Sequence, residues 1–147
     1  MIEPDQMRRN VSDLLTLLSD VEAQREYQRD VPIASVPVEM RCMWLDDMYH
    51  PDDAVFRRAF SAEERAALAK FHAIYEAVTA EIRPWPEVLA DLQALPAWDR
   101  VLQAASVALR VLSSARPLGY GSADDFGTHS GSSSLYAEAC ATSPIPN

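Results

Sequence analysis

The clearest hydrophobic pattern in the chain lies between Ser61 and Ile82. Apolar residues recur there at alternating steps of three and four, which places them on one face of a helix with 3.6 residues per turn. They are Leu68, Phe71, Tyr75, Val78 and Ile82, with Ala67 and Ile74 widening the face. Ser61 and Glu64 have the spacing of a capping box, and Pro84 stops the helix. The pattern predicts a helix whose start and end are both marked in the sequence. We expect the rest of the chain to pack against it.

The same spacing predicts helices on both sides of this segment. We expect one long helix from Asp5 to Gln28, whose charged last turns project into solvent. A short helix should follow Pro51, with Asp52 and Asp53 at its positive end, and another should begin at Pro86. Residues 97–114 have so narrow a polar face that we expect the central helix of the bundle there, packed against residues 61–82.

The segment from Val38 to Pro51 fits two patterns. A strand would place Val38, Met40, Cys42 and Trp44 on one face, whereas a helix would bury Val38, Cys42, Leu45 and Tyr49, with Arg41, Trp44 and Met48 alongside. No second strand is apparent for it to pair with, and a lone strand leaves its backbone groups unpaired. We therefore predict a helix, preceded by an extended connector over residues 31–36.

Glycine divides the sequence into two parts. All four glycines follow residue 118, and the glycine-free part suits helices joined by short turns. The sequence therefore predicts an all-α fold: a single helical bundle of five to six helices over residues 1–115, followed by a Gly/Ser-rich, flexible or loosely docked tail over residues 116–147.

Composition narrows the classes of function. The chain has 22 acidic and 13 basic residues, a net charge of −9, and Lys70 as its only lysine. Because binding to phosphate backbones normally requires a basic stripe, nucleic acid is an unsuitable partner. The apolar runs are too short for a membrane span, and the first ten residues lack the apolar core of a secretory signal. We expect a cytoplasmic protein in which Cys42 and Cys140 remain thiols.

The densest group of polar residues that could carry chemistry lies between residues 46 and 53. It contains Asp46, Asp47, His50, Asp52 and Asp53. The spacing lacks the glycine and closing glutamate of a calcium loop, so we expect these residues to end one helix and begin the next, with no metal or other cofactor. His72 and Glu76 are four residues apart, which indicates a solvated pair on a helix surface. No nucleophile motif is present.

The leading hypothesis is therefore a non-enzymatic module that binds a basic protein. Its most specific form is a bacterial inhibitor of the immunity or antitoxin type, whose carboxylates cover the basic active site of a toxin. Carboxylates beside aromatic rings suit such an interface, so the expected contact residues are Trp44, Asp46, Asp47, Tyr49, Asp52 and Asp53. One alternative is a metal-dependent hydrolase that uses residues 46–53. The other is a homo-oligomeric structural subunit, such as a homodimer joined through apolar helix faces.

Overall fold

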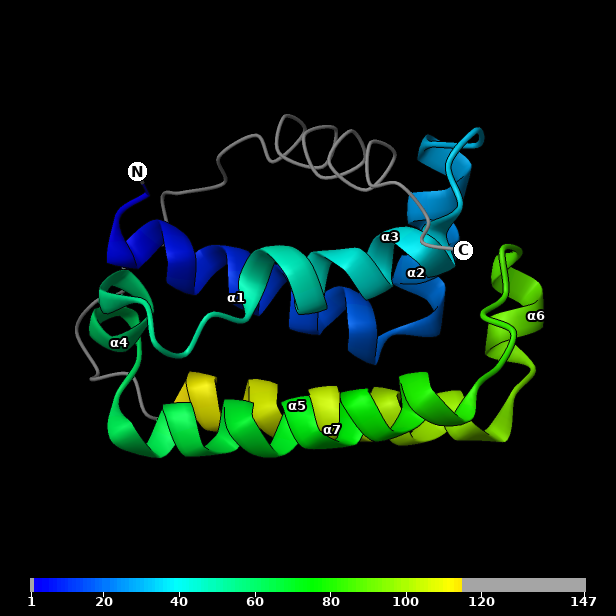
Figure 1. Cartoon of the computed structure of the whole chain (residues 1–147). Helices are drawn as coiled ribbons and strands as arrows, with labels where there is room; N and C mark the ends of the chain where they lie inside the picture. Colours follow the sequence, from blue (N-terminus) through cyan, green and yellow to red (C-terminus); the bar gives the residue numbers. More distant parts are fainter. Residues whose placement is uncertain (1, 115–147) are drawn as a thin grey trace.

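The structure, a computed structural model, describes residues 2–114 and is helical in every regular element of that range (Figure 1). The predicted all-α fold is confirmed. The predicted tail and the domain boundary at residue 115 lie outside the described residues. The elements are α1 (Pro4–Ser19), α2 (Val21–Asp30), α3 (Val36–Cys42), the π-helical turn η1 (Met43–Met48), α4 (Ala54–Ala59), α5 (Ala62–Glu81), α6 (Leu89–Gln93) and α7 (Pro96–Ser114).

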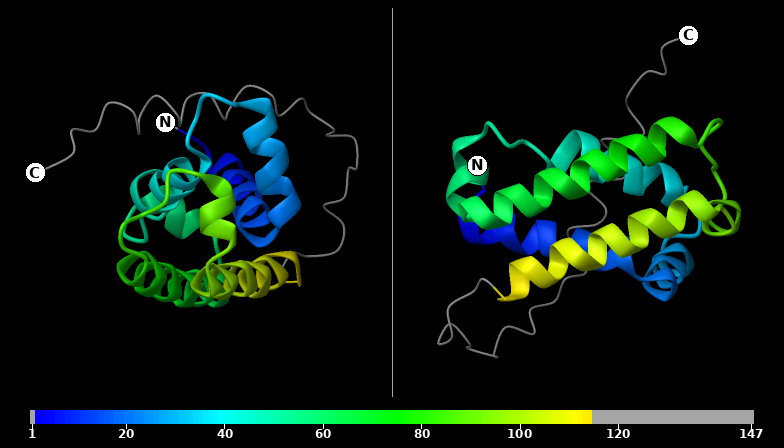
Figure 2. Two further views of the ribbon diagram at one scale, coloured as in Figure 1. Left: turned by 90° about the vertical axis from the view of Figure 1, so that its right-hand side faces the viewer. Right: turned by 90° about the horizontal axis from the view of Figure 1, so that it is seen from below.

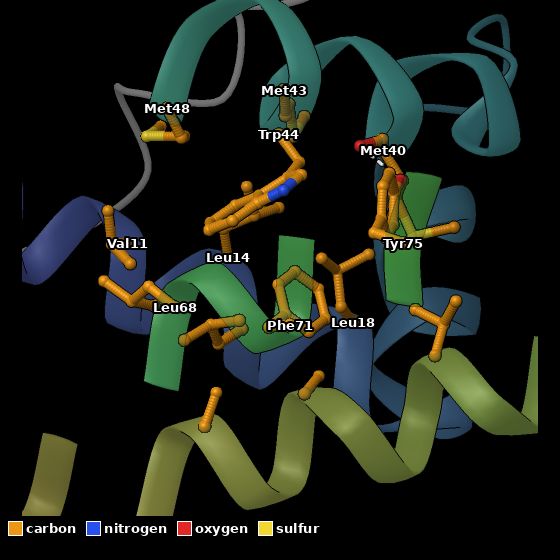
Figure 3. Packing of buried hydrophobic residues seen from close by; sticks show 14 of the residues in the cluster. Val11, Leu14, Leu18, Met40, Met43, Trp44, Met48, Leu68, Phe71 and Tyr75 are labelled. Carbon is orange, nitrogen blue, oxygen red and sulfur yellow. Dashed lines mark hydrogen bonds between the residues drawn. The ribbon is translucent and has the colours of Figure 1, made fainter. Parts of the chain in front are cut away.

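The helices form two layers around one apolar core. Helices α5 and α7 run side by side as one layer, and α1 lies across from them together with α3 and η1 (Figures 1 and 2). Trp44 extends from η1 into the space between the layers, where Leu14 and Phe71 also lie (Figure 3). None of the described helices has both the length and the apolar character that a membrane crossing needs.

Helix α5 follows its predicted pattern closely. The Ser61 side chain accepts a hydrogen bond from the Glu64 backbone, and Glu64 accepts one from the Ser61 backbone, so the capping box is confirmed. The predicted apolar stripe is buried, but its widening residues differ, because Ala67 is half-buried and Ile74 is 40 % exposed. The buried face is narrower than predicted because α7 covers only part of that side.

The single helix predicted over residues 5–28 is wrong, since the chain breaks at Asp20. The Asp20 backbone is extended, and its carboxylate accepts hydrogen bonds from the backbone N–H groups of Glu22 and Ala23, which caps α2. The break turns α2 back onto the bundle. Its Gln24 is fully buried instead of projecting into solvent.

Residues 38–48 are helical, as predicted, but the helix already begins at Val36 and ends at Met48, and the predicted extended connector contains a turn over residues 31–34. The helical residues also bury a different face. The buried apolar side chains are Val36, Pro37, Met40, Met43, Trp44 and Met48, whereas the four expected to be buried on one face, Val38, Cys42, Leu45 and Tyr49, are only half-buried. The difference begins in α3, where Val36, Pro37 and Met40 are buried and the helix contacts α2 and α6. In the π-helical turn that follows, the Tyr49 N–H donates to the Trp44 carbonyl five residues back at 3.1 Å, and Met43 and Met48 are both buried.

Helix α7 packs against α5 as predicted, but it is not central. The helix with neighbours on most sides is α1, which contacts α7, α4, η1 and α2. Helix α7 lies in the outer layer and leaves Val107 53 % exposed. Helix α6 also begins later than predicted, at Leu89, and leaves Val88 in solvent.

Candidate partner-binding surface

The six residues predicted to contact a partner lie on one continuous segment, η1 and the loop that follows it. Asp46, Asp52 and Asp53 are exposed, and Asp47 and Tyr49 are half-buried. Trp44 has no exposed surface. Its ring therefore cannot touch a partner directly, and its part in the surface is to hold the segment onto the core.

Hydrogen bonds between residues close in sequence give the loop after η1 a defined shape. The His50 Nε2 atom lies 2.9 Å from the Asp46 carbonyl oxygen, and the Asp53 N–H donates to the His50 carbonyl at 3.0 Å. The Asp53 carboxylate then accepts from the Val55 N–H at 3.0 Å and caps α4. The predicted role of this aspartate at the start of a helix is confirmed.

Tyr49 connects this segment to two other helices. Its ring stacks on Trp44 of η1 at 5.1 Å and on His72 of α5 at 4.3 Å, and it meets Phe56 of α4 edge to face at 5.6 Å, all measured between ring centroids. Such aromatic pairs add about 0.5–1.5 kcal/mol each beyond the burial of their area. The position of the acidic loop is therefore set by packing against α4 and α5.

His72 and Glu76 are the residues of this surface that the sequence interpretation missed. The indole N–H of Trp44 donates to His72 Nδ1 at 3.3 Å, and His72 Nε2 lies 3.2 Å from a Glu76 carboxylate oxygen. The His72 side chain is only 25 % exposed, so the prediction of a solvated pair holds for Glu76 and is wrong for His72. Twenty-eight residues separate Trp44 from His72, and no local pattern could have paired them.

The exposed carboxylates of Asp46, Asp52, Asp53 and Glu76 are called the acidic surface below. The pKa of the Tyr49 phenol is raised by burial and then by the charges of Asp52 and Glu76, so these two carboxylates act on Tyr49. The nearest cation is Arg57, 3.7 Å from the Asp52 carboxylate, in a pair whose aspartate is fully exposed. Within residues 2–114, Asp46 and Asp53 take part in no ion pair. The negative charge of this surface is therefore largely uncompensated.

Asp47 differs from its neighbours because part of its carboxylate is enclosed. One of its oxygens, Oδ2, is buried and has no hydrogen-bond partner among the described residues. The pKa of Asp47 is raised by burial first and by the charge of Asp46 second, while His50 acts in the opposite direction. Asp47 is therefore less accessible to a partner than the exposed Asp46, Asp52 and Asp53.

The described part of the chain contains no group of three or more His, Cys, Asp or Glu side chains arranged to hold a metal ion. Hollows elsewhere in the described residues include one of about 930 Å³ bordered by Arg25, Ile33 and Val88, and a groove of about 380 Å³ between α5 and α7. Neither is lined by a residue of the acidic surface.

Comparison with known proteins identifies no relative. No protein-family model matches this chain, and no curated protein or solved structure matches it either.

Proposed function

We propose that this chain is a non-enzymatic module that binds a basic protein through the acidic surface. The observation that carries the proposal is the set of exposed carboxylates of Asp46, Asp52, Asp53 and Glu76, two of which act on Tyr49, with Arg57 as the one arginine or lysine paired with them in the described residues. Uncompensated carboxylates on a defined scaffold favour association with a positively charged partner and exclude negatively charged ones.

The scaffold beneath these carboxylates supports the same proposal. The loop is fixed by its hydrogen bonds to η1 and α4, and by the stacking of Tyr49 on both Trp44 and His72. A partner that binds it orders few additional side chains, which lowers the entropic cost of association. Tyr49 offers a half-buried aromatic ring at the centre of the surface, a residue type enriched at protein interfaces.

In its most specific form, the proposal is a cytoplasmic bacterial inhibitor of the immunity or antitoxin type. Such a protein needs a stable acidic face and no reaction machinery of its own. The net charge of −9 is consistent with a partner whose active site is lined by lysine and arginine, as in enzymes that act on nucleic acids.

Charge reversal tests the acidic surface directly. Asp46 and Asp52 are the best positions, because both are exposed, whereas Asp47 is enclosed and Asp53 caps a helix. The double variant Asp46→Lys, Asp52→Lys is compared with Asp13→Lys, Glu26→Lys, which changes the net charge equally at exposed sites on α1 and α2. Each protein is immobilised and exposed to a lysate of the cells that encode the chain.

We expect the wild type and the control variant to retain the same basic protein. The Asp46→Lys, Asp52→Lys variant should retain at least about tenfold less, because like charges brought together in an interface cost several kcal/mol. Retention by the wild type should also fall as the salt concentration rises. If both variants retain the partner equally, or if the wild type retains none, the acidic surface is not the binding site.

A further inference from the structure

The three tryptophans of this chain differ in the group that accepts their indole N–H. Trp85 donates to the Pro37 carbonyl at 3.0 Å, and Trp98 donates to the Gln24 side-chain oxygen at 3.3 Å. Trp44 donates to His72 Nδ1 at 3.3 Å. Carbonyl and amide oxygens keep their lone pairs at every physiological pH, whereas an imidazole nitrogen loses its lone pair when it is protonated. The bond of Trp44 is therefore the one that acid can break.

The hydrogen bond also fixes the form of the His72 ring. An indole N–H is only a donor, so Nδ1 must carry a lone pair, and the proton of the neutral ring is on Nε2, which faces Glu76 at 3.2 Å. A second proton would have to go to Nδ1, opposite the indole N–H. Because Trp44 has no exposed surface, water cannot take the place of the lost acceptor. Protonation of His72 and its bond to Trp44 are mutually exclusive.

Several charged or titratable groups lie on the segments around the His72 ring. Glu76 on the same helix places a carboxylate oxygen 3.2 Å from His72 Nε2. The segments that carry the aromatic neighbours of His72 and Tyr49 add Asp46 and Asp47 of η1, Tyr49, His50, Asp52 and Asp53 of the loop, and Arg57 and Arg58 of α4.

We infer that His72 is a pH-responsive clamp that positions the acidic surface. While neutral, His72 binds Trp44 through Nδ1 and stacks on Tyr49, which holds η1 and the following loop against α5. Once protonated, it releases the Trp44 indole N–H, and the π-helical turn loses its hydrogen bond to α5 and keeps the packing of Trp44 on Phe71. Helix α3 stays in place, because the Tyr75 hydroxyl donates to the Met40 carbonyl at 3.0 Å independently of His72 (Figure 3).

The consequence for binding rests on the proposed function. A partner that recognises Asp46, Asp52 and Asp53 in the clamped arrangement binds more weakly once mild acid releases the segment that carries them. The clamp therefore makes release of the partner a response to acidification. His72 acts here as a positioning residue, since it holds the residues that would touch the partner.

The indole resonances of the full chain test the clamp without the partner. The three side-chain ¹H–¹⁵N cross-peaks of a ¹⁵N-labelled sample are followed from about pH 8 to about pH 5, the range in which histidine changes charge. We expect the Trp44 cross-peak to move with a single inflection that coincides with the titration of the His72 ring protons. The Trp85 and Trp98 cross-peaks should stay in place and serve as internal controls.

Two matched variants identify the titrating group. His72→Asn keeps an acceptor close to the position of Nδ1 but cannot be protonated, so it should keep the Trp44 cross-peak near its high-pH position and abolish the response. His50→Asn removes a neighbouring exposed histidine whose Nε2 atom lies 2.9 Å from the Asp46 carbonyl oxygen, and it should leave the response intact, because the Trp44 indole N–H donates to His72 instead. His129 is present in both variants, so any effect of its titration would persist in both.

The outcomes separate the clamp from the proposed function. A Trp44 cross-peak that stays fixed while His72 titrates, or that still moves in His72→Asn, overturns the clamp. Partner retention that is unchanged between about pH 7.5 and about pH 5.5 while the Trp44 cross-peak moves overturns its regulatory role. The charge-reversal comparison at neutral pH tests the acidic surface whatever the indole spectrum shows. The wild-type titration also remains decisive should His72→Asn fail to fold.

Discussion

The guanidinium of Arg8 on α1 donates to the carboxylate of Glu64 in the first turn of α5, with Nη1 and Oε1 2.8 Å apart. Arg8 also donates to the backbone carbonyls of Ala59 and Leu112, at 3.2 and 2.9 Å. Glu64 at the same time completes the capping box with Ser61. One ion pair therefore joins α1 to α4, α5 and α7, and both of its side chains are largely buried.

Neutralising Glu64 should destabilise the fold. In Glu64→Gln, the Arg8 charge stays largely buried without its counter-ion, while the amide oxygen can still cap Ser61. We expect the free energy of unfolding to fall by about 2 kcal/mol, less than the loss of a fully buried pair, because Arg8 keeps its two carbonyl acceptors. Urea denaturation measures the change. The matched control is Glu81→Gln in the exposed Arg100 pair, which should cost at most about 0.5 kcal/mol. Equal losses in the two variants would contradict the assigned role of Glu64.

The contribution of Glu64 should also depend on pH. Burial acts to raise the pKa of this carboxyl, but the hydrogen bonds from Arg8 and Ser61 and the charge of Arg8 outweigh it and hold the pKa below the ordinary value of 4.5. The folded state therefore binds the proton less tightly than the unfolded state does. Its stabilisation is complete above pH 4.5 and is lost as the pH falls through the lowered pKa. The gap in stability between wild type and Glu64→Gln should shrink in that window. A gap that stays constant or widens in acid would show that the charge of Glu64 does not stabilise the fold.

The contribution of Asp47 to stability should depend on pH in the opposite direction. Its pKa is raised, chiefly by burial, so its contribution is favourable below the ordinary value of 3.8 and is lost as the pH rises through the raised pKa. At neutral pH the charged form destabilises the fold, and its Oδ2 atom has no hydrogen-bond partner in the described residues. We expect Asp47→Asn to stabilise the protein by about 0.5 kcal/mol near pH 7, a figure reduced for solvent screening. Thermal unfolding at two pH values checks it. The exposed neighbour Asp46, changed to Asn, is the control, and a larger gain there would contradict the burial argument.

Gln24 should be among the most sensitive polar positions. It is fully buried, donates to the Leu17 carbonyl at 3.0 Å, and accepts from Gln93 and Trp98 at 3.0 and 3.3 Å. Gln24→Leu nearly preserves the volume but leaves the buried Trp98 indole N–H without its acceptor, while Gln93 keeps the Val21 carbonyl and the Leu17 carbonyl keeps the Asp20 N–H. We therefore expect a loss of about 2–3 kcal/mol in the free energy of unfolding. Gln103→Leu, at an exposed position of α7, should change stability by less than about 0.5 kcal/mol. A tolerated leucine at position 24 would mean that the network around Trp98 rearranges freely.

Features that depend on near neighbours in the chain could be predicted from the sequence. Helix α5, its capping box and its buried stripe from Leu68 to Ile82 follow from residues at most four positions apart, and the cap by Asp53 and the inward face of α4 do as well. The cap at Asp20 was equally local, but the continuous apolar spacing on either side of it masked the break. Asp46, Asp52 and Asp53 of the acidic surface could likewise be named from the sequence, whereas Glu76 could not.

Only the tertiary structure decided which side chains lie beneath the exposed acidic residues. Trp44 is buried, Asp47 is half-enclosed, and His72 supports the loop from a helix whose pattern had placed it in solvent. Packing also buried a different face of residues 36–48 from the one that their spacing predicted. Helical periodicity and capping are properties of a few consecutive residues. The bond between Trp44 and His72 exists only once two helices have packed at one particular depth and rotation, and no stretch of consecutive residues encodes that.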